Sequence, residues 1–577
     1  MTRVAPRKPA GPKGQRHDYP WLKAYPKSVS WEAQFEPQPL GHMLDQAVAA
    51  YGSRNCTYFL GKTMTYAEIG DLCNRIAKGL QQRGVGKGTH VGLLLPNSPS
   101  YVAYYFGVLK TGATVVNYNP LYTIEELEEQ ARDSDTTFLV TLDLAMLFDK
   151  AEALLEKGVI ETAVVCTFTD LLPGAKSVLF KLFKRKELGD PHGSDQRHRI
   201  VLEDDLVAND GGYKRVDIEP SRDIAVLQYT GGTTGTPKGA MLTHANLSIN
   251  VQQIKDWTTS LEIGAERVMG ILPFFHVFAM TTVLNFGVVM GAEIILMPRF
   301  DLYDALKLIG SLKATVLPGV PTLYNAMLHH PRIEKVDLSS LKFCISGGAA
   351  LPVEVKRRFE KVSGCELVEG YGLSETSPVA TCNPVDGPVK EGSIGIPVPR
   401  TVISIRALDN PERELGTGED GEICIKGPQV MTGYWNRPEE TREAFAGDYF
   451  RSGDVGHMDE DGFTFIIDRL KDMINASGFK IYPRRVEEAI YAHPAVEEVT
   501  VVGVPDEYRG EAPKAFVKLK KGRSASAEEL FEFLKPKISK LEMPSGIEFR
   551  DELPKTMVGK LSKRELRAEN KDAEAEG

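Results

Sequence analysis

The stretch "IAVLQYTGGTTGTPKG", residues Ile224 to Gly239, decides the fold. Its first seven residues have the apolar pattern of a buried strand, and a loop rich in glycine and threonine follows directly. Glycines let backbone N–H groups approach phosphate oxygens, threonine hydroxyls add donors, and Lys238 adds a positive charge. The pattern therefore predicts a phosphate-binding loop at the end of a strand, in preference to an ordinary mobile polar loop.

This loop does not fit the Walker A motif, G-x-x-x-x-G-K-[ST]. Pro237 precedes Lys238, and Gly239 follows it where a magnesium-binding hydroxyl should stand. Another kind of phosphate chemistry is therefore expected, and the rest of the chain has to identify it.

Apolar runs alternate with helical patterns between residues 90 and 370. The expected strands are "VGLLLP", "TFLVTL", "IAVLQYT", "RVMGILP", "EIILMP" and "KFCISGG", and "ANLSINVQQIKDW" and "PVEVKRRFEKV" are expected helices. This alternation predicts an α/β fold of parallel sheets covered by helices on both faces. Ligands in such folds bind at the carboxyl ends of strands, which is where the glycine and threonine loop begins.

The pattern changes twice toward the C-terminus. After residue 392, "VISIRA", "EICIKG" and "FTFIID" alternate like half-exposed antiparallel strands. After residue 472, "PRRVEEAIYAHP", "VEEVTVVGVP", "KAFVKLKKG" and "AEELFEFLKPKI" predict a small α+β unit of about 100 residues. The charged joint "DRLKD" lies between the two patterns.

Bulk properties exclude several classes of protein. The chain has 577 residues, which predicts more than one domain, and a net charge of −9, which argues against a general nucleic-acid binder. Its seven cysteines form no C-x-x-C pair, so neither a zinc cage nor a disulfide framework is expected, and a reducing cytoplasm suits them.

The uncharged segment from Met269 to Ala292 is long enough to span a bilayer, but Pro273, His276 and Asn285 interrupt it, so we expect it to form part of the buried core.

Four further motifs could carry chemistry, and each has an ordinary structural alternative. "ISGGAALP" leaves room for a flat ligand but is also a common strand-to-helix turn. "EGYGLSETSP" offers an aromatic ring, a hydroxyl and a carboxylate that could bind magnesium. Asp454 in "YFRSGDVG" could accept both ribose hydroxyls or simply form a turn. Lys560 in "LPKTMVGKLSKREL" would alone be interpreted as a solvated surface charge.

In this order the motifs resemble those of the AMP-forming adenylation superfamily, which includes acyl-CoA synthetases, luciferases and peptide-synthetase adenylation domains. The resemblance covers roughly residues 35 to 570 and is strongest to bacterial long-chain fatty acid–CoA ligases. It is carried by "LQYTGGTTGTPKGAMLTHANL", "EGYGLSETSP", "GSIGIPVP", "GEICIKGPQVMTGYWNRPEET", "DRLKDMINASGFKIYP" and "RDELPKTMVGKL".

The resemblance implies a domain organisation. A basic mobile arm would occupy residues 1–34. A large AMP-binding domain of parallel α/β sheets plus a small β-barrel would occupy 35–467. A hinge at 468–472 would lead to a small mobile α+β domain at 473–577. Asp468 stands where some relatives have glycine before the hinge arginine, a variation familiar among fatty acid ligases.

The resemblance also implies an activity. ATP would activate a fatty acid to acyl-adenylate with release of pyrophosphate, and CoA would then displace AMP, with Mg²⁺ as cofactor and ATP and CoA as co-substrates. Two alternatives stay open: a ligase that loads a carrier protein, and a nucleotide- or lipid-binding regulator without turnover. Acyl chain length, and whether dicarboxylic or aryl acids are used, do not follow from the sequence.

The resemblance assigns roles to individual residues. Lys560, His276 and Glu375 would be catalytic, Lys471 would be the hinge, Gly478 would contact CoA, and Thr230 and Glu375 would bind the metal. "LPGVP", residues 317–321, would line the acyl tunnel. The ATP- and AMP-binding residues would be Thr230, Gly231, Gly232, Thr233, Thr234, Gly235, Lys238, Gly348, Ala349, Tyr371, Gly372, Ser374, Asp454 and Arg469.

The stretch "AKSVLFKLFKRKELG", Ala175 to Gly189, places apolar residues at helical spacing among lysines and arginine. Such a segment can lie on an anionic membrane surface. The alternative is a surface helix packed on its own domain. The expected location is the cytoplasm, with peripheral contact at the inner face of the membrane and a homodimer as further candidate associations, and no nucleic acid is expected as a partner.

Overall fold

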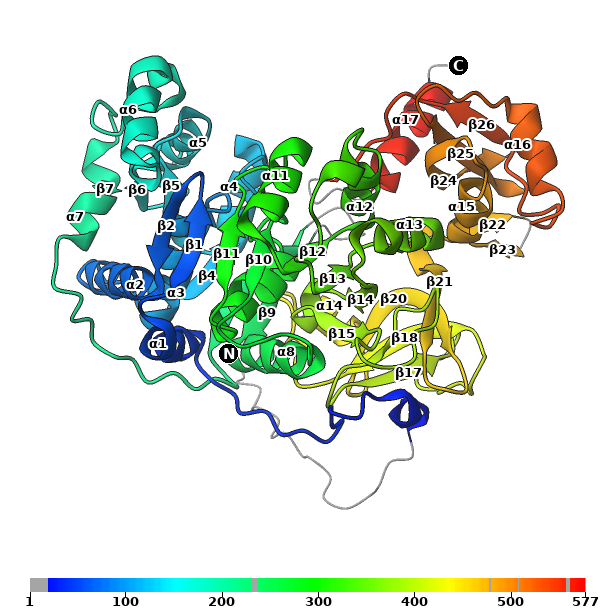
Figure 1. Ribbon diagram of the computed structural model, residues 1–577, viewed down its shortest axis with the longest axis horizontal. Coiled ribbons are helices and arrows are strands. Elements are labelled where there is room, and N and C mark those ends of the chain that lie inside the picture. Colours follow the sequence, from blue (N-terminus) through cyan, green and yellow to red (C-terminus); the bar gives the residue numbers. More distant parts are fainter. Residues whose placement is uncertain (1–18, 231–236, 477–478, 507, 557–560, 576–577) are drawn as a thin grey trace.

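Two largely parallel sheets form the body of the molecule, as the alternating pattern predicts (Figure 1). The computed structural model describes residues 19–230, 237–476, 479–506, 508–556 and 561–575. The first sheet has the strand order β7-β6-β5-β3-β4-β8-β9, and its last pair is antiparallel. Its strands are β3 (His90–Leu94), β4 (Thr114–Asn117), β5 (Thr136–Leu142), β6 (Thr162–Cys166), β7 (Ile200–Leu202), β8 (Ile224–Thr230) and β9 (Lys238–Thr243).

The second sheet has the order β16-β15-β14-β13-β12-β10-β11-β1-β2, parallel from β14 to β1 and antiparallel at both edges. Its strands are β1 (Asn55–Phe59), β2 (Lys62–Thr65), β10 (Arg267–Gly270), β11 (Glu293–Leu296), β12 (Val316–Gly319), β13 (Phe343–Ser346), β14 (Leu367–Gly372), β15 (Val379–Cys382) and β16 (Ile396–Pro397). The expected α/β class is confirmed, because continuous apolar runs such as "FCIS" are buried on both faces.

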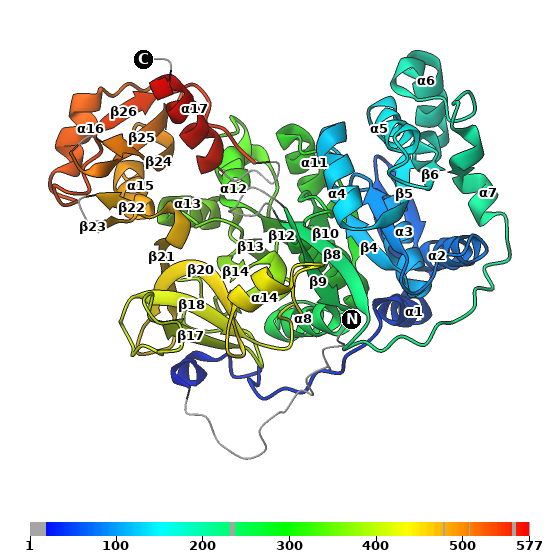
Figure 2. The ribbon, with the colours of Figure 1, turned by 180° about the vertical axis from the view of Figure 1, so that it is seen from behind.

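Helices cover both sheets, and several begin with a side-chain cap. Thr243 accepts the N–H of Asn246 at the start of α8, which ties this helix to the end of β9. In both views α4, α5, α6, α11 and α12 lie along the upper edge, beyond the carboxyl ends of the strands they follow (Figures 1 and 2). The helices are α1 (Leu40–Tyr51), α2 (Tyr66–Gln81), α3 (Pro99–Lys110), α4 (Ile124–Asp133), α5 (Ala145–Glu156), α6 (Gly174–Phe183), α7 (Glu203–Val207), α8 (His244–Trp257), α9 (Val277–Ala279), α10 (Phe286–Val289), α11 (Leu302–Leu312), α12 (Pro321–Leu328), α13 (Val353–Ser363) and α14 (Pro438–Glu443).

The region expected to form a small β-barrel is an antiparallel sheet with the order β17-β18-β20-β19, in which β21 also pairs with β20. Within the described residues no strand pairing closes this sheet into a barrel, because β17 pairs only with β18 and β19 is two residues long. The strands are β17 (Val402–Arg406), β18 (Gly421–Lys426), β19 (Phe445–Ala446), β20 (Tyr449–Met458) and β21 (Thr464–Arg469).

The C-terminal unit has its own sheet and its own core. The strand order is β23-β22-β25-β24, with β26 beside β25, and Val486, Val501, Val517 and Leu530 are fully buried among its elements. The elements are β22 (Ile474–Ala476), β23 (Phe479–Ile481), α15 (Pro483–Tyr491), β24 (Val496–Asp506), β25 (Gly510–Leu519), α16 (Ala527–Leu534), β26 (Gly546–Phe549) and α17 (Lys563–Ala575). A separate core is what an independently moving unit requires.

The prediction of an N-terminal arm is corrected for residues 19–34. Residues 1–18 lie outside the described part, but residues 19–34 pack on the large domain instead of forming a free arm. Trp21 is 2% exposed, the Tyr25 hydroxyl donates to the carbonyl of Pro397, and the Trp31 ring N–H donates to the carbonyl of Thr401. Three aromatic side chains, Trp21, Tyr25 and Trp31, hold this segment on the large domain.

The uncharged segment from Met269 to Ala292 is core, as expected. It begins at the end of β10, and α9, a π-helical segment (Met280–Asn285) and α10 follow, with almost every side chain buried. No helix in the described part of the chain is both long enough and apolar enough to cross a bilayer.

Candidate active site

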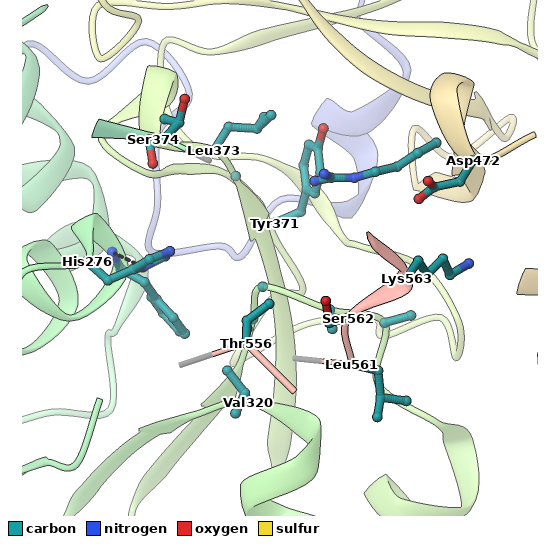
Figure 3. Close-up of a pocket in the computed structure, with 18 of the residues that line it drawn as sticks. His276, Val320, Tyr371, Leu373, Ser374, Asp472, Thr556, Leu561, Ser562 and Lys563 are labelled. Atoms are coloured by element: carbon teal, nitrogen blue, oxygen red, sulfur yellow. Dashed lines mark hydrogen bonds between the residues drawn. The ribbon is translucent and has the colours of Figure 1, made fainter. Parts of the chain in front are cut away.

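A large cleft of about 2740 Å³ opens where strands of both sheets end. Its walls come from the end of β8, from the segments after β12 and β13, from the end of β14, and from the C-terminal unit. Figure 3 shows His276, Val320 and Tyr371 of the large domain around the same cavity as Thr556, Leu561 and Ser562 of the C-terminal unit. The carboxyl ends of parallel strands thus form one side of the site.

Most of the predicted site residues that the structure describes lie on this cleft. The lining residues are Thr230, Lys238, His276, Gly348, Ala349, Tyr371, Gly372, Ser374, Glu375, Arg469 and Lys471. Asp454 touches two of them. The remaining predictions fall outside the described residues, namely Gly231, Gly232, Thr233, Thr234, Gly235, Gly478 and Lys560.

A buried carboxylate with two partners, here called the acidic corner, consists of Asp454, Arg469 and Tyr371. Asp454 and Arg469 lie opposite each other on the adjacent strands β20 and β21. The Arg469 Nε atom lies 3.1 Å from Asp454 Oδ1, and the Tyr371 hydroxyl donates to Asp454 Oδ2 at 2.7 Å. Burial raises the pKa of Tyr371, and the Asp454 carboxylate adds to that shift, so the phenol stays protonated and remains a donor. A polar ligand with two hydroxyls could meet this corner.

Tyr434, which the sequence reasoning missed, joins two predicted site residues. Its hydroxyl donates to Glu375 Oε1 at 2.8 Å, and Lys238 Nζ lies 5.4 Å from the centre of its ring. Burial raises the pKa of Glu375, whereas the Tyr434 hydroxyl opposes the shift. The signal was present, because Tyr434 lies in the motif "GYWNRPEET", but nothing in the sequence indicates which way its ring points.

A second missed cluster lies at the end of β8. The Tyr229 hydroxyl donates to Asp133 Oδ2 at 2.6 Å, and Arg437 Nη2 donates to the other oxygen, also at 2.6 Å. These contacts tie the end of α4 and the segment before α14 to the strand that carries the loop. They anchor the end of β8 to both segments.

Two glycines of the site are required by geometry. Gly348 has φ near +80°, a conformation that other residues rarely adopt. A Cβ atom on Gly372 would stand 1.7 Å from the carbonyl oxygen of Pro378, so only glycine fits there. Both positions keep bare backbone beside the cleft.

The apolar wall of the cleft follows β10. Phe275, Val277 and Phe278 line it on either side of His276, and Val320 faces them from the segment after β12. His276 is half-buried, and its Nδ1 atom accepts the Phe278 N–H at 3.3 Å. Because Nδ1 accepts this hydrogen bond, a neutral ring carries its proton on Nε2. The wall suits an apolar ligand that ends in a polar group.

The joint between the two units is held by contacts of Asp468 and Arg484. Asp468 Oδ2 accepts the Arg484 N–H at 2.8 Å, and Arg484 Nη1 donates to the carbonyl of Ile466 at 3.0 Å. Burial raises the pKa of Glu369 to about 7, and the positive charge of Arg484 opposes this rise. Arg484 therefore belongs to the C-terminal unit but interacts with β21 and β14 of the large domain.

No cluster of three or more His, Cys, Asp or Glu side chains that could hold a metal ion occurs in the described part of the chain. The seven cysteines are buried thiols without disulfides. Thr230 and Glu375 nevertheless present hydroxyl and carboxylate oxygens on the wall of one cleft, and these are ligand types that Mg²⁺ prefers. The donor chemistry thus fits magnesium with water or phosphate completing its shell.

Known proteins match the chain over nearly its whole length. Residues 44–435 match the family model described as AMP-binding enzyme, and residues 485–560 match the AMP-binding enzyme C-terminal domain. A long-chain-fatty-acid–CoA ligase of Bacillus subtilis (strain 168) is 44% identical over 95% of this chain and 97% of its own length. The enzyme of the same name from Escherichia coli O157:H7 is 38% identical over 95% and 98%.

Solved structures show the same arrangement. ATP-bound MatB from Rhodopseudomonas palustris superposes with a TM-score of 0.80 at 28% identity, covering 92% of this chain and 99% of that one. The apo form of the same protein gives 0.72 over 93% and 99%. The present chain thus resembles the ATP-bound form more than the apo form.

Proposed function

The chain belongs to the AMP-binding enzyme family, and we propose that it is an ATP-dependent long-chain fatty acid–CoA ligase of fatty acid metabolism. A fatty carboxylate attacks the α-phosphorus of ATP, pyrophosphate leaves, and the CoA thiol then displaces AMP from the acyl-adenylate. One observation carries this proposal. A single cleft combines an apolar wall, the cation Lys238 at the start of β9 and a buried acidic corner.

The nucleotide would bind along the ends of β13, β14 and β20. Gly348, Ala349 and Tyr371 would frame adenine against bare backbone, and Asp454 with Arg469 would hold the ribose hydroxyls. The existing Tyr371–Asp454 and Arg469–Asp454 contacts support this role, because they orient the carboxylate before the ligand arrives.

The phosphates would occupy the glycine and threonine loop, with Lys238 and Ser374 beside them. The loop glycines and threonines that would contact phosphate are Gly231, Gly232, Thr233, Thr234 and Gly235. A carboxylate attacks an anionic phosphate poorly, so positive charge has to neutralise the developing charge. Magnesium held by Thr230 and Glu375 would supply part of that charge. The Tyr434 contacts support the arrangement, since they keep Glu375 and Lys238 on one side of the cleft.

The acyl chain would lie along the wall after β10 and β12, lined by Phe278 and Val320. His276 would orient the carboxylate at the inner end of this wall. Its Nδ1 atom accepts a backbone N–H, which supports a donor role for Nε2.

The C-terminal unit would serve the two steps in turn. We propose that Lys560 reaches the α-phosphate during adenylation, and that rotation about Lys471 then brings Gly478 to CoA. Thr556 and Leu561, on either side of the segment that holds Lys560, line the cleft and support the first of these orientations. Exclusion of water from the adenylate is the physical reason for such closure.

The proposal is tested by a pyrophosphate-release screen with acids from acetate to oleate, followed by analysis of the thioester. Release that depends on a long-chain acid, with the acyl group on CoA, is the expected result. A thioester formed only on a carrier protein would favour the carrier-loading alternative. Binding of ATP without pyrophosphate release from any acid would favour a regulator.

The proposed partners besides substrates are an anionic membrane surface, contacted peripherally at its inner face, and a second copy of the chain. Sedimentation of the enzyme with and without vesicles distinguishes the two.

A further inference from the structure

Helix α6 packs on the molecule by one side only. The Phe180 ring meets the Phe168 ring edge-on at 5.1 Å, and Ser177 on the same side is half-buried. The helix lies at an outer corner of the molecule in both views, at the far end from the C-terminal unit (Figures 1 and 2). One helical face is thus occupied and the opposite face is open to its surroundings.

The open face is apolar, which reverses the usual orientation of a surface helix. Val178 is 58% exposed, Leu179 53%, Leu182 70% and Phe183 79%. With 3.6 residues per turn these side chains form one stripe, and that stripe lies on the side of the helix away from Phe180 and Ser177. Single exposed apolar residues are ordinary, but a contiguous stripe of four large ones indicates a docking surface.

Exposed cations flank the stripe. They are Lys176, Lys181, Lys184, Arg185 and Lys186. Lys184 pairs with Glu187, and Lys176 Nζ donates to the carbonyl of Leu60 at 2.7 Å, which brings the half-exposed Leu60 beside the helix. The chain as a whole carries a net charge of −9, so this cluster opposes the overall sign. Its charge is complementary to an anionic partner.

We propose that this surface, the α6 patch (Val178, Leu179, Leu182 and Phe183 with Lys181, Lys184, Arg185 and Lys186), docks on an anionic lipid bilayer. The apolar stripe enters the interfacial region while the cations meet lipid headgroups. No described helix could span the bilayer, so the contact is peripheral. A protein partner would explain an apolar stripe equally well, but the ring of cations around it favours the lipid surface.

The position of the α6 patch relates membrane docking to the cleft. Helix α6 follows β6 at the same upper edge at which the segments after β12 and β13 line the cleft (Figure 1). Docking through α6 would therefore turn the edge that bears the cleft toward the membrane. A fatty acid leaving the bilayer would need to cross little water to reach it. This last point rests on the proposed ligase function, whereas the docking itself does not.

The test uses the full chain and vesicles of phosphatidylcholine with or without phosphatidylglycerol. We expect co-sedimentation with the anionic vesicles, weakened by added salt. The variant Leu182→Ser/Phe183→Ser should lose most binding to both vesicle types. Replacing Lys181, Lys184, Arg185 and Lys186 by Gln should cost about fivefold in affinity per cation and remove the preference for anionic lipid.

Matched controls lie elsewhere on the surface. Ile263 is 48% exposed before β10, at the opposite edge, so Ile263→Ser should bind like the parent enzyme. Gln in place of the exposed Lys521, Lys535, Lys537 and Lys540 of the C-terminal unit should also change little. Pyrophosphate release with a long-chain acid supplied in solution without vesicles should be equal in all variants, which separates failure of docking from failure of the ligase.

Absence of binding by the parent enzyme, or binding unchanged by both salt and the α6 substitutions, would overturn the proposal. Sedimentation of the protein without lipid tests the alternative that the α6 patch contacts a second copy of the chain. If Leu182→Ser/Phe183→Ser converts a dimer to a monomer while vesicle binding is unchanged, the patch is a contact between copies of the chain and not a lipid surface.

Discussion

Arg484→Gln should slow adenylation selectively. The Arg484 side chain is only 14% exposed, and its Nη1 atom donates to the carbonyl of Ile466, which belongs to the other unit. The pair with Glu488 lies within α15 and does not cross the joint. The substitution keeps the backbone N–H that Asp468 accepts, so the helix start is preserved. What is removed is the charge-assisted contact with Ile466 and the attraction between Arg484 and Glu369, both of which join the two units.

Hydrogen bonds to charged groups contribute about 1.5–3 kcal/mol. Arg484→Gln would therefore destabilise the present orientation of the two units by that free energy, relative to any orientation that lacks the contact. The ratio of the two populations would change roughly 10- to 150-fold. If this orientation performs adenylation, formation of acyl-adenylate should slow by up to that factor. Transfer from supplied acyl-adenylate to CoA should keep its rate or accelerate.

The assay measures the two half-reactions separately in single-turnover experiments. Arg485→Gln is the matched control, because Arg485 is the next residue on α15 but pairs with Glu542 of its own unit, at 3.2 Å. Equal slowing of both half-reactions, or the same asymmetry in Arg485→Gln, would refute the reasoning.

Three other predictions follow from the site. Glu375→Gln should lower pyrophosphate release on the order of a hundredfold and abolish its dependence on magnesium, and a magnesium titration of the rate checks both effects. Lys560→Ala should lose adenylation but still convert acyl-adenylate and CoA to thioester, whereas Lys471→Pro, which fixes φ at the hinge, should do the reverse in the same two assays. Glu369→Gln should raise Tm more at pH 8 than at pH 5. The folded-state pKa of Glu369, about 7, exceeds the ordinary 4.5, so its burial costs stability that grows as pH rises through this window.

Strands of both kinds, continuous apolar runs and alternating ones, could be predicted from the sequence almost to the residue. "IAVLQYT" coincides with β8, and "FTFIID" is displaced from β21 by one residue. Alternation also predicted strands after residue 392, but it does not show how they pair, and the described strands form an antiparallel sheet whose pairings leave it open. The arm was wrong for residues 19–34, because Trp31 bonds to Thr401 and Trp21 packs against Gly462, both more than three hundred residues away. The composition of a segment does not predict contacts with residues so far away in the sequence.

Motifs predicted which residues line the cleft but not how their side chains meet. Tyr371 and Asp454 come from separate motifs, and their contact depends on the placement of β14 beside β20. Tyr434 was not predicted as a site residue although its motif was recognised. Its place in the site depends on simultaneous contacts with Glu375 and Lys238, which the motif does not indicate. Arg484 could not be found at all, because its significance arises only where two units meet.

The packed N-terminal segment has a consequence for synthesis on the ribosome. Tyr25 and Trp31 bond to Pro397 and Thr401, which follow them by 372 and 370 residues. At about 5–20 residues per second, those partners emerge about 20 to 75 seconds later. Throughout that interval Tyr25 and Trp31 lack their native partners. The segment that carries them is therefore among the last to pack, and a chaperone that meets the nascent protein would find these aromatic residues still exposed.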